Sequence, residues 1–438
     1  MDILLVNAPE KKRSEHAGQN PPLGLAYIAA VLLRAGYNIS AIDFNISDFD
    51  PLVLERILEK DMPRILGISA HTETYLSGLK IAQTAKQVNQ GITVVMGGTH
   101  PTVMYQEAAR EKDVDVVVRG EGEYTMLELA NCLIRNEASL AEIKGIAYKD
   151  NGVVRVTSDR PYIENPDDLP FPAIELFPIA LYNLPGRVLL SRGGCPFSCR
   201  FCAANNIWKG GRRFRSPENV VAEILRIYEN YKFEEIGFSD DTFTLNRDYV
   251  IKLCNLSKKI REVFPWRWSC STRVDLVDKE LLEEMREAGC YNIQFGVEAG
   301  SQKILDSIGK RITPKQVREA VSAAIDIGME VVCFFMFPHP EDTEETIHEQ
   351  KQLMKELIGM GVTISLSFTT PFPGTYYYEH ADELGIKILA NSWDEYNGKQ
   401  LSMTTKYLSE ERLKCLFEEL NQDVARHTWL AMQKMFGG

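Results

Sequence analysis

The chain has 438 residues and a formal net charge of −12, with 45% hydrophobic and 25% charged residues. This length exceeds what one hydrophobic core ordinarily supports, so two or three domains are expected. The acidic balance argues against broad binding to nucleic acid, which usually needs a basic face. No apolar run is long enough to span a bilayer, and the opening MDILLVNAPEKK lacks the basic start of a signal peptide. We therefore expect a cytoplasmic protein.

Short apolar runs alternate with helical periodicity over residues 1–142. Strands are expected near 3–7, 38–43, 65–69, 92–98 and 114–120, and helices near 21–36, 51–60, 76–89, 103–111 and 123–135. Apolar strands separated by helices predict a doubly wound, Rossmann-like parallel sheet that is covered on both faces. Ligands of such sheets bind at the carboxyl ends of the strands. The candidate binding segments are therefore 69–73, 97–102 and 120–123.

A hairpin and a stiff linker are expected over residues 143–186. The run KGIAYKDNGVVRVT at 144–157 places Asn-Gly between two β-rich segments, which is typical of a hairpin. Six prolines between residues 160 and 185 then predict an extended linker.

A second β/α series occupies residues 187–375. Its strands are expected near 187–191, 235–239, 267–272, 292–296, 331–336 and 363–368, with helices between them. Six strand–helix units predict a partial (β/α)6 barrel of the TIM type, whose chemistry lies at the C-terminal strand ends. Residues 376–438 are expected to be mainly helical and to shape substrate choice, and ERLKCLFEELNQDVARHTWLAMQKMF forms a terminal helix.

Three of the nine cysteines stand together, in the segment RGGCPFSCRFCAANN directly after the first strand of this series. Structural zinc sites usually use four ligands in two pairs, and no second C-x₂-C follows here. Three closely spaced thiolates suit a [4Fe–4S] cluster whose fourth iron stays open for another ligand. The alternative is a zinc or purely redox loop. The six isolated cysteines are expected to be buried apolar residues.

This spacing, with Phe201 before the third cysteine, resembles the signature of the radical S-adenosylmethionine (SAM) superfamily. The resemblance implies a [4Fe–4S] cluster on Cys195, Cys199 and Cys202 that binds SAM at its open iron. It also implies that the reduced cluster cleaves SAM to methionine and a 5′-deoxyadenosyl radical, which abstracts hydrogen from the substrate.

Further strand ends resemble the SAM-binding segments of the same superfamily. They are GFSDDTF for the SAM amino group, STRVDL for the carboxylate, FGVEAGS for the ribose or amino group, and FMFPHPEDT for the adenine. The residues implied in SAM binding are Phe201, Ser239, Asp240, Asp241, Arg273, Glu298, Met336 and Pro338. The alternatives are helix capping by one of the two aspartates and ordinary salt bridges for the arginine and the glutamate.

Three residues near the last strands are candidates for a catalytic role. His339 is either a solvated loop residue or a group of the substrate pocket. Tyr376 and Tyr377 follow a Pro-x-Pro-Gly-Thr segment that one radical SAM subgroup shares, and they either offer a phenolic acid or cover an apolar face.

The first domain resembles the cobalamin-binding domain that precedes the core of cobalamin-dependent radical SAM enzymes. The resemblance rests on PPLGLAYIAAVLLRAGYNISAID, GISAHTET, VVMGGTHPT and VVVRGEGEYT. The residues implied in cobalamin binding are Leu23, Gly24, Ser69, His71, Thr72, Glu73, Gly97, Gly98, Thr99, His100, Gly120, Glu121 and Glu123.

Several of these residues have a second interpretation. His71 either faces the cobalt or hydrogen-bonds in the pocket, and His100 lies either near the nucleotide tail or simply in a loop. Gly97 and Gly98 would let the backbone approach that tail. Acidic residues at 121 and 123 also suit the start of a helix, which the helix dipole favours. The Asp-x-His-x-x-Gly cobalt-ligand motif is absent, and His16 lacks its spacing.

The combined resemblance implies a C-methyltransferase that moves a methyl group from methylcobalamin to an unactivated carbon after hydrogen abstraction. The alternatives are cobalamin-dependent cyclisation, oxidation or rearrangement, a tRNA methylthiotransferase, and a non-enzymatic cobalamin or iron–sulfur sensor. The substrate stays open among a peptide or protein side chain, a tetrapyrrole, a lipid and a small metabolite or natural-product intermediate. Flavodoxin or ferredoxin is the expected reductant, and no nucleic acid is expected as a partner.

Overall fold

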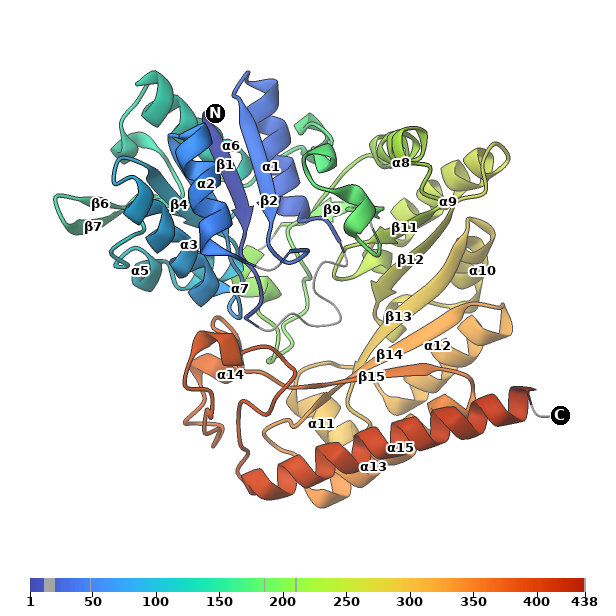
Figure 1. Ribbon diagram of the computed structural model, residues 1–438. Helices are drawn as coiled ribbons and strands as arrows, with labels where there is room; N and C mark the ends of the chain where they lie inside the picture. Colours follow the sequence, from blue (N-terminus) through green and yellow to red (C-terminus); the bar gives the residue numbers. More distant parts are fainter. Residues whose placement is uncertain (12–19, 48, 185, 209–210, 437–438) are drawn as a thin grey trace. The chain divides into compact units, whose positions relative to one another are not determined.

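The structure is a computed structural model that describes residues 1–11, 20–47, 49–184, 186–208 and 211–436, the last six of these by backbone alone. The chain forms two compact units (Figure 1). The first unit comprises Met1–Arg187, Asn206–Trp208 and Asn391–Tyr396. The second unit comprises Val188–Asn205, Lys209–Ala390 and Asn397–Gly438. His16 lies outside the described residues.

The first unit is built on a seven-stranded sheet in the order β2-β1-β3-β4-β5-β6-β7. Its strands are β1 (Ile3–Asn7), β2 (Ile39–Asp43), β3 (Ile65–Ser69), β4 (Thr93–Gly97), β5 (Val116–Val118), β6 (Ile146–Asp150) and β7 (Val153–Val156). Strands β1 to β5 pair in parallel. The predicted Rossmann-like sheet is confirmed.

Helices cover both faces of this sheet, which is why its central parallel strands are largely apolar. They are α1 (Leu23–Arg34), α2 (Pro51–Asp61), α3 (Tyr75–Val88), α4 (Thr99–Val103), α5 (Tyr105–Ala108) and α6 (Glu123–Ala130). Helix α1 packs with α6, and α2 packs with α3 (Figure 1). Residues Ile3 to Val6 are at most 1% exposed, so neither face of β1 meets solvent.

The predicted hairpin is confirmed, and it belongs to this sheet. Strand β6 pairs antiparallel with β5, and β7 pairs antiparallel with β6. Asn151 and Gly152 have φ of 49° and 81°, as a tight hairpin turn requires. The proline-rich stretch that follows also packs on the first unit, because Ala173 N–H donates to the Ala26 carbonyl at 3.0 Å and the Tyr182 hydroxyl donates to Asp43 at 2.9 Å.

The second unit carries a six-stranded sheet in the order β15-β14-β13-β12-β11-β8. These strands are β8 (Arg187–Val188), β11 (Glu235–Phe238), β12 (Arg267–Thr272), β13 (Cys290–Glu298), β14 (Glu330–Phe337) and β15 (Thr363–Phe368). Neighbours from β11 to β15 pair in parallel. The short strands β9 (Ser191–Arg192) and β10 (Arg213–Phe214) form a separate antiparallel pair. The partial β/α barrel is confirmed.

Helices alternate with these strands and begin where the sequence supplies caps. They are α7 (Ala204–Trp208), α8 (Pro217–Tyr231), α9 (Arg247–Arg261), α10 (Lys279–Glu287), α11 (Gln302–Ser307), α12 (Pro314–Asp326), α13 (Glu344–Gly359), α14 (Tyr376–Glu379) and α15 (Glu410–Phe436). Ser216, Asn246 and Thr313 accept backbone N–H groups at the starts of α8, α9 and α12. The terminal helix expected from the sequence is α15.

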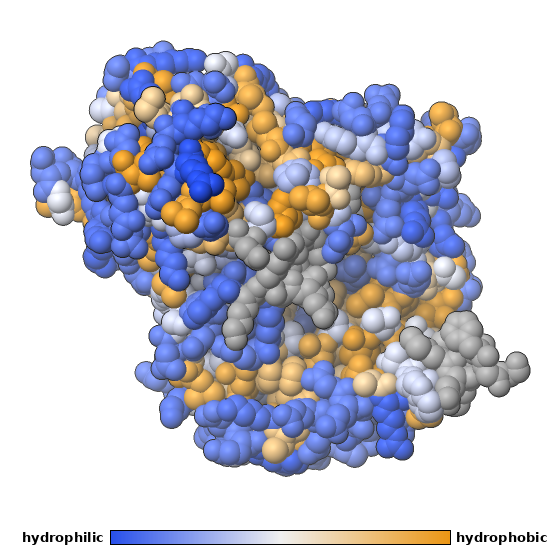
Figure 2. Space-filling view, viewed as in Figure 1, coloured by the Kyte–Doolittle hydropathy of each residue, from blue (hydrophilic) through white to orange (hydrophobic). Residues whose placement is uncertain are grey.

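No helix in the described part of the chain has the length and apolar composition of a membrane span. Figure 2 shows mostly hydrophilic residues on the side of the molecule in view, with smaller apolar areas among them. Trp429 on α15 is one of the exposed apolar residues, at 57%.

Candidate functional site

The loop between β9 and α7 carries Cys195, Cys199 and Cys202, all as free thiols. Cys202 N–H donates to the Cys199 carbonyl at 3.0 Å, which closes a turn between the two ligands. Gly193, at φ 107°, opens the loop, and a Cβ there would stand 2.4 Å from the Gly211 carbonyl oxygen. Glycine is therefore required for the entry into the cluster loop.

The three thiols suit an iron–sulfur cluster better than a single ion. No group of three or more His, Cys, Asp or Glu side chains in the described residues could hold one metal ion. A cubane binds each thiolate to a different iron, so its ligands stand farther apart than those of one ion. Burial raises the pKa of Cys199, while Lys310 and Arg273 lower it. These two cations favour the thiolate form that a cluster needs.

The segment after β11 holds the cluster loop in place. Asp240 accepts Leu190 N–H at 2.7 Å and both the N–H and hydroxyl of Ser191 at 2.9 and 2.7 Å. Burial raises the pKa of Asp240 to about 6. The next residue, Asp241, accepts the N–H of Cys195.

Helix capping as the role of one of these aspartates is wrong, because Asn246 caps α9. Ser239 is exposed beside them, so its side chain is open to a ligand.

Strand β13 ends in a strained residue. Glu298 has a φ of 72°, a backbone conformation that residues other than glycine rarely adopt. Residues strained in this way are often found at functional sites. Its carboxylate turns back over Gly296, where a Cβ would stand 2.6 Å from Glu298 Oε1 and 2.9 Å from Lys310 Nζ. Lys310 and Glu298 form an ion pair of 2.9 Å, with both residues less than 10% exposed.

Arg273, the next candidate along the sheet, joins the same network. It binds Asp275 through two nitrogens at 2.9 Å and donates to the Lys310 carbonyl at 2.6 Å. Its guanidinium lies 3.9 Å from the ring centre of Phe197 in the cluster loop. The structure therefore brings Arg273 and Glu298 together with the cluster loop.

Sequence reasoning missed Lys310, which lies beyond the strand end in IGKRIT. A basic residue soon after the Gly-Val-Glu segment was the available signal.

The candidates after β14 and β15 lie in different environments. His339 is fully buried, so its interpretation as a solvated residue is wrong. Tyr377 is 1% exposed and its hydroxyl lies 3.2 Å from His339 Nδ1. Tyr376 is 37% exposed and its ring stacks on His380 at 4.0 Å. Pro338 is buried, and Met336 is half-buried on the sheet face opposite Phe335 and Phe337.

In the first unit, the predicted cobalamin residues meet at the carboxyl ends of β3, β4 and β5. His71 Nδ1 lies 3.0 Å from Thr99 Oγ1, and His100 Nδ1 lies 3.3 Å from Thr72 Oγ1. Ser69 and Gly97 end β3 and β4, and Glu73 follows β3 within the same loop. Two loops of the sheet edge are thus joined by side-chain bonds.

Two glycines border open space at this edge. A Cβ at Gly24 in the first turn of α1, beside Leu23, or at Gly120 after β5 would meet no atom within 4 Å. Gly98 is different, because its φ is 105° and a Cβ would stand 2.4 Å from the Ala70 carbonyl oxygen. Access for the cofactor tail is therefore not the complete explanation for a glycine at position 98. The neighbouring loop already requires glycine there.

The glutamates after β5 are buried. Glu121 accepts Ile163 N–H at 2.8 Å. Glu123 lies in the first turn of α6, whose N-cap residue is Gly122. Glu123 stands where the helix dipole favours an acidic residue, so this interpretation stays open beside a role in cofactor binding.

His100 is the feature that best fits a bound cofactor. It is 1% exposed, and its Nε2 finds no hydrogen-bond partner in the described chain. Burial lowers its pKa to about 4, so the imidazole is neutral near pH 7. A buried polar atom without a partner is costly, so a ligand that bonds to it would relieve that cost. Together with the open space at Gly24 and Gly120, this fits cobalamin.

No pattern in the sequence indicates that residues from the C-terminal region belong to the first unit. Trp393 stands 4.8 Å from the His100 ring centre and donates from its indole to Glu107 at 2.8 Å. Tyr75 covers the same imidazole at 4.3 Å. His100 is therefore enclosed by two aromatic rings, one of them from Asn391–Tyr396.

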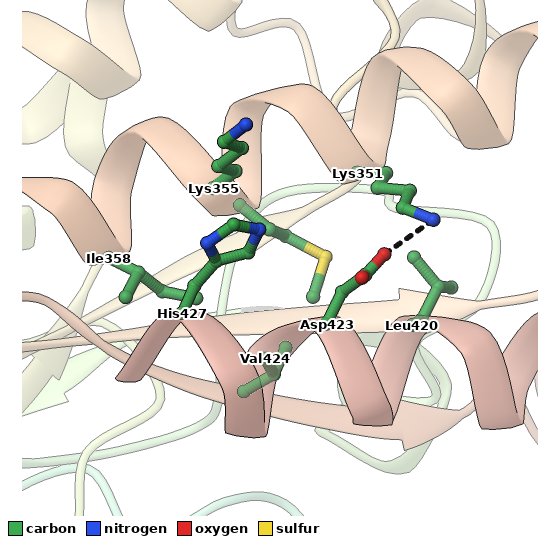
Figure 3. A pocket seen from close by; sticks show the side chains of 8 residues that line it. Lys351, Lys355, Ile358, Leu420, Asp423, Val424 and His427 are labelled. Carbon is green, nitrogen blue, oxygen red and sulfur yellow. Dashed lines mark ion pairs between the residues drawn. The ribbon is translucent and has the colours of Figure 1, made fainter. Parts of the chain in front are cut away.

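A hollow between α13 and α15 is separate from these residues (Figure 3). It is lined by side chains such as Met354, Ile358 and His427, and Lys351 pairs there with Asp423. Active sites of β/α barrels lie at the C-terminal strand ends, whereas this hollow lies between two outer helices that run side by side. It is a packing feature and not part of the candidate site.

The fold and the cysteine loop define the class of protein. The family model of the radical SAM superfamily matches residues 190–354, and that of the B12 binding domain matches residues 14–130. The chain belongs to the radical SAM enzymes that carry a B12-binding domain. Its cofactors are a [4Fe–4S] cluster, SAM and cobalamin.

A relative covers almost the whole chain. The protein named Uncharacterized methyltransferase PH0819, from Pyrococcus horikoshii, is 34% identical over 428 residues, which cover 96% of this chain and 91% of the relative. Anaerobic magnesium-protoporphyrin IX monomethyl ester cyclase of Rubrivivax gelatinosus is 29% identical, covering 88% of this chain and 70% of that protein.

Solved structures show the same fold. TsrM from Kitasatospora setae, a radical SAM methyltransferase with cobalamin and a [4Fe–4S] cluster bound, superposes with a TM-score of 0.76 at 17% identity, over 98% of this chain and 89% of that one. The cobalamin-dependent S-adenosylmethionine radical enzyme OxsB superposes with a TM-score of 0.78 at 16% identity, over 95% of this chain and 66% of that one.

Proposed function

We propose that this protein is a C-methyltransferase that transfers a methyl group, carried by cobalamin, to an unactivated carbon of its substrate. The observation that carries the proposal is the relative named a methyltransferase, which is similar over both units and not over one domain alone. When bound, the reduced cluster supplies the electron that splits SAM, and cobalamin supplies the methyl group.

The residues of the second unit would bind and orient SAM. Cys195, Cys199 and Cys202 would hold three irons of the cluster. Lys310 and Arg273 supply positive charge for the SAM carboxylate, and Glu298 supplies a carboxylate for its amino group or ribose. Ser239 and Asp241 are the better-placed residues of GFSDDTF, because the Asp240 oxygens already accept three donors. Phe201, Met336 and Pro338 would border the adenosine.

The residues of the first unit would bind cobalamin at the carboxyl edge of its sheet. His100 Nε2 is free to accept or donate one hydrogen bond, and Gly24 and Gly120 leave room beside the backbone. His71 is held by Thr99, so we assign it to the pocket wall. Tyr376 is the exposed member of the catalytic candidates, and we assign Tyr377 and His339 to support. We also propose the cytoplasm as location and flavodoxin or ferredoxin as reductant.

The test is anaerobic reconstitution with iron, sulfide and cobalamin, followed by incubation with SAM labelled in its methyl group and a reductant. We expect 5′-deoxyadenosine and label in the cobalamin fraction, and then in a product when tetrapyrroles, peptides and small metabolites are supplied. SAM cleavage without label in cobalamin or any product would contradict methyl transfer. That result would favour the oxidative cyclase, the second candidate, which the similarity to the protoporphyrin ester cyclase supports.

A further inference from the structure

His339 and Tyr377 form a buried polar pair. Neither residue belongs to the proposed cluster ligands or to the proposed SAM-binding residues. His339 is 0% and Tyr377 1% exposed, and the phenol hydroxyl lies 3.2 Å from His339 Nδ1. Neither side chain reaches solvent, so neither can meet a substrate directly. A buried hydrogen bond of this kind fixes the relative position of its two side chains. The second ring nitrogen, His339 Nε2, has no hydrogen-bond partner in the described chain.

Each member of the pair is fixed on its own side. The backbone N–H of His339 donates to Asp342 Oδ2 at 2.7 Å, and Asp342 Oδ1 accepts the Thr346 hydroxyl at 2.8 Å, so the turn before α13 fixes the backbone that carries the imidazole. Tyr377 stands in the first turn of α14, where Thr375 is the N-cap. The two rings are therefore carried by different elements, and they meet through the hydroxyl and an edge-on ring contact with 6.3 Å between the ring centres.

The pair connects two parts of the SAM-binding end of the barrel. Tyr377 N–H donates at 3.3 Å to the carbonyl of Arg200, which lies between the second and third cluster cysteines. Phe201, the next residue, has its ring centre 6.0 Å from that of His339. On the other side, burial lowers the pKa of the His339 imidazole to about 4, and the backbone of Glu298 raises it by a smaller amount.

A second connection closes a ring of contacts. Arg200 N–H donates to the Ile308 carbonyl at 3.0 Å, and Lys310, two residues further on, pairs with Glu298. The cluster loop is thus held against the end of β13 from both sides. One side is the backbone near Lys310, and the other is Tyr377 with His339.

We propose that His339 and Tyr377 are positioning residues that set the cluster loop against Glu298, and so fix the distance between the cluster and the bound SAM. This inference rests on the proposed role of Glu298 in binding SAM. It does not depend on whether the methyl group reaches a carbon. Glu298 has a strained φ of 72°. A residue in that conformation persists only when its surroundings hold it, and the His339–Tyr377 pair would be part of those surroundings.

The test uses Tyr377→Phe, which removes the hydroxyl and leaves the backbone bond to Arg200. The full-length holoprotein is reduced anaerobically, and the electron paramagnetic resonance spectrum of its cluster is followed as SAM is added. We expect wild-type iron content but about tenfold more SAM for half-saturation, because His339 Nδ1 is left buried and unpaired. Tenfold corresponds to about 1.4 kcal/mol.

Two further variants separate positioning from general stability. His339→Gln keeps a polar group for Tyr377, so its SAM concentration at half-saturation should stay within about twofold of the wild-type value. His339→Leu removes that group and should resemble Tyr377→Phe. The matched control is Tyr291→Phe, which removes a tyrosine hydroxyl bonded to Glu235 at the amino ends of the strands. It should leave the SAM titration unchanged.

Equal SAM titrations and spectra for wild type, Tyr377→Phe and His339→Leu would overturn the inference. If Tyr377→Phe loses its iron, the comparison of His339→Gln with His339→Leu decides, and equal half-saturation in those two overturns it. Failure of the proposed function looks different. In that case wild-type protein still shows the SAM-dependent spectral change, but no labelled methyl group appears in cobalamin or product.

Discussion

The indole of Trp393 packs edge-on against the imidazole of His100, with 4.8 Å between the ring centres and 66° between the ring planes. The two residues lie far apart in the sequence and belong to the same compact unit. The B12-binding unit is therefore completed by a short segment that follows the last strand of the barrel. Trp393 also packs against the main hydrophobic cluster of that unit.

Replacement of Trp393 by alanine should lower the free energy of unfolding of the first unit by about 2 kcal/mol. A fully buried tryptophan would cost more, and Trp393 is only half-buried. Hydrogen exchange of the β3 and β4 amides would measure the change. Trp429→Ala, on the exposed surface of α15, is the control and should change nothing. Equal exchange in both variants would contradict a structural role for the segment.

Replacement of Cys199 by serine should reduce the iron content and abolish SAM cleavage, because three thiolates are the least that the proposed cluster needs. The measurements are iron per chain after reconstitution and the yield of 5′-deoxyadenosine. Cys415→Ser offers a matched control, since Cys415 is also a free thiol but exposed on α15. A Cys199→Ser protein that still cleaved SAM would show that the cluster is bound elsewhere.

Replacement of Lys310 by methionine should destabilise the second unit by about 3 kcal/mol, because it leaves the buried Glu298 carboxylate without its cation. It should also weaken SAM binding, while Lys310→Arg keeps the charge and most of the affinity. Urea unfolding and SAM titration measure the two effects. Lys315→Met breaks an exposed pair with Glu319 and should cost less than about 0.5 kcal/mol. Similar losses in both methionine variants would argue against a buried pair.

Most of the architecture could be predicted, because each parallel strand is a short apolar run and both sheet faces are buried. Once the strands are predicted, the sequence also indicates which residues stand at their carboxyl ends, and Arg273 and Glu298 are two of them. The burial of His339 could not be predicted, since its loop sequence FPHPED looks polar and its cover comes from Phe201 and Tyr377. Trp393 was equally hidden, because its segment has no periodicity and packs on residues far away in the sequence.

Acid should destabilise the first unit through His100. Burial lowers the pKa of His100 from the ordinary 6.5 to about 4, so the folded state disfavours the protonated form. The stability that comes from the neutral imidazole is therefore present above about pH 6.5 and is lost as the pH falls toward 4. A shift of this size corresponds to roughly 3 kcal/mol.

Hydrogen exchange of the β4 amides between pH 4 and 7, corrected for intrinsic rates, measures this loss. His100→Gln should be less stable than wild type at pH 7 and should show a weaker dependence on pH, because glutamine does not titrate. His348→Gln, at an exposed position on α13, should keep the wild-type dependence. A cobalamin group that donates a hydrogen bond to neutral His100 Nε2 would oppose protonation there, so bound cobalamin should increase the loss of stability in acid. A pH profile that is the same for wild type and His100→Gln would mean that His100 is not buried as the structure has it.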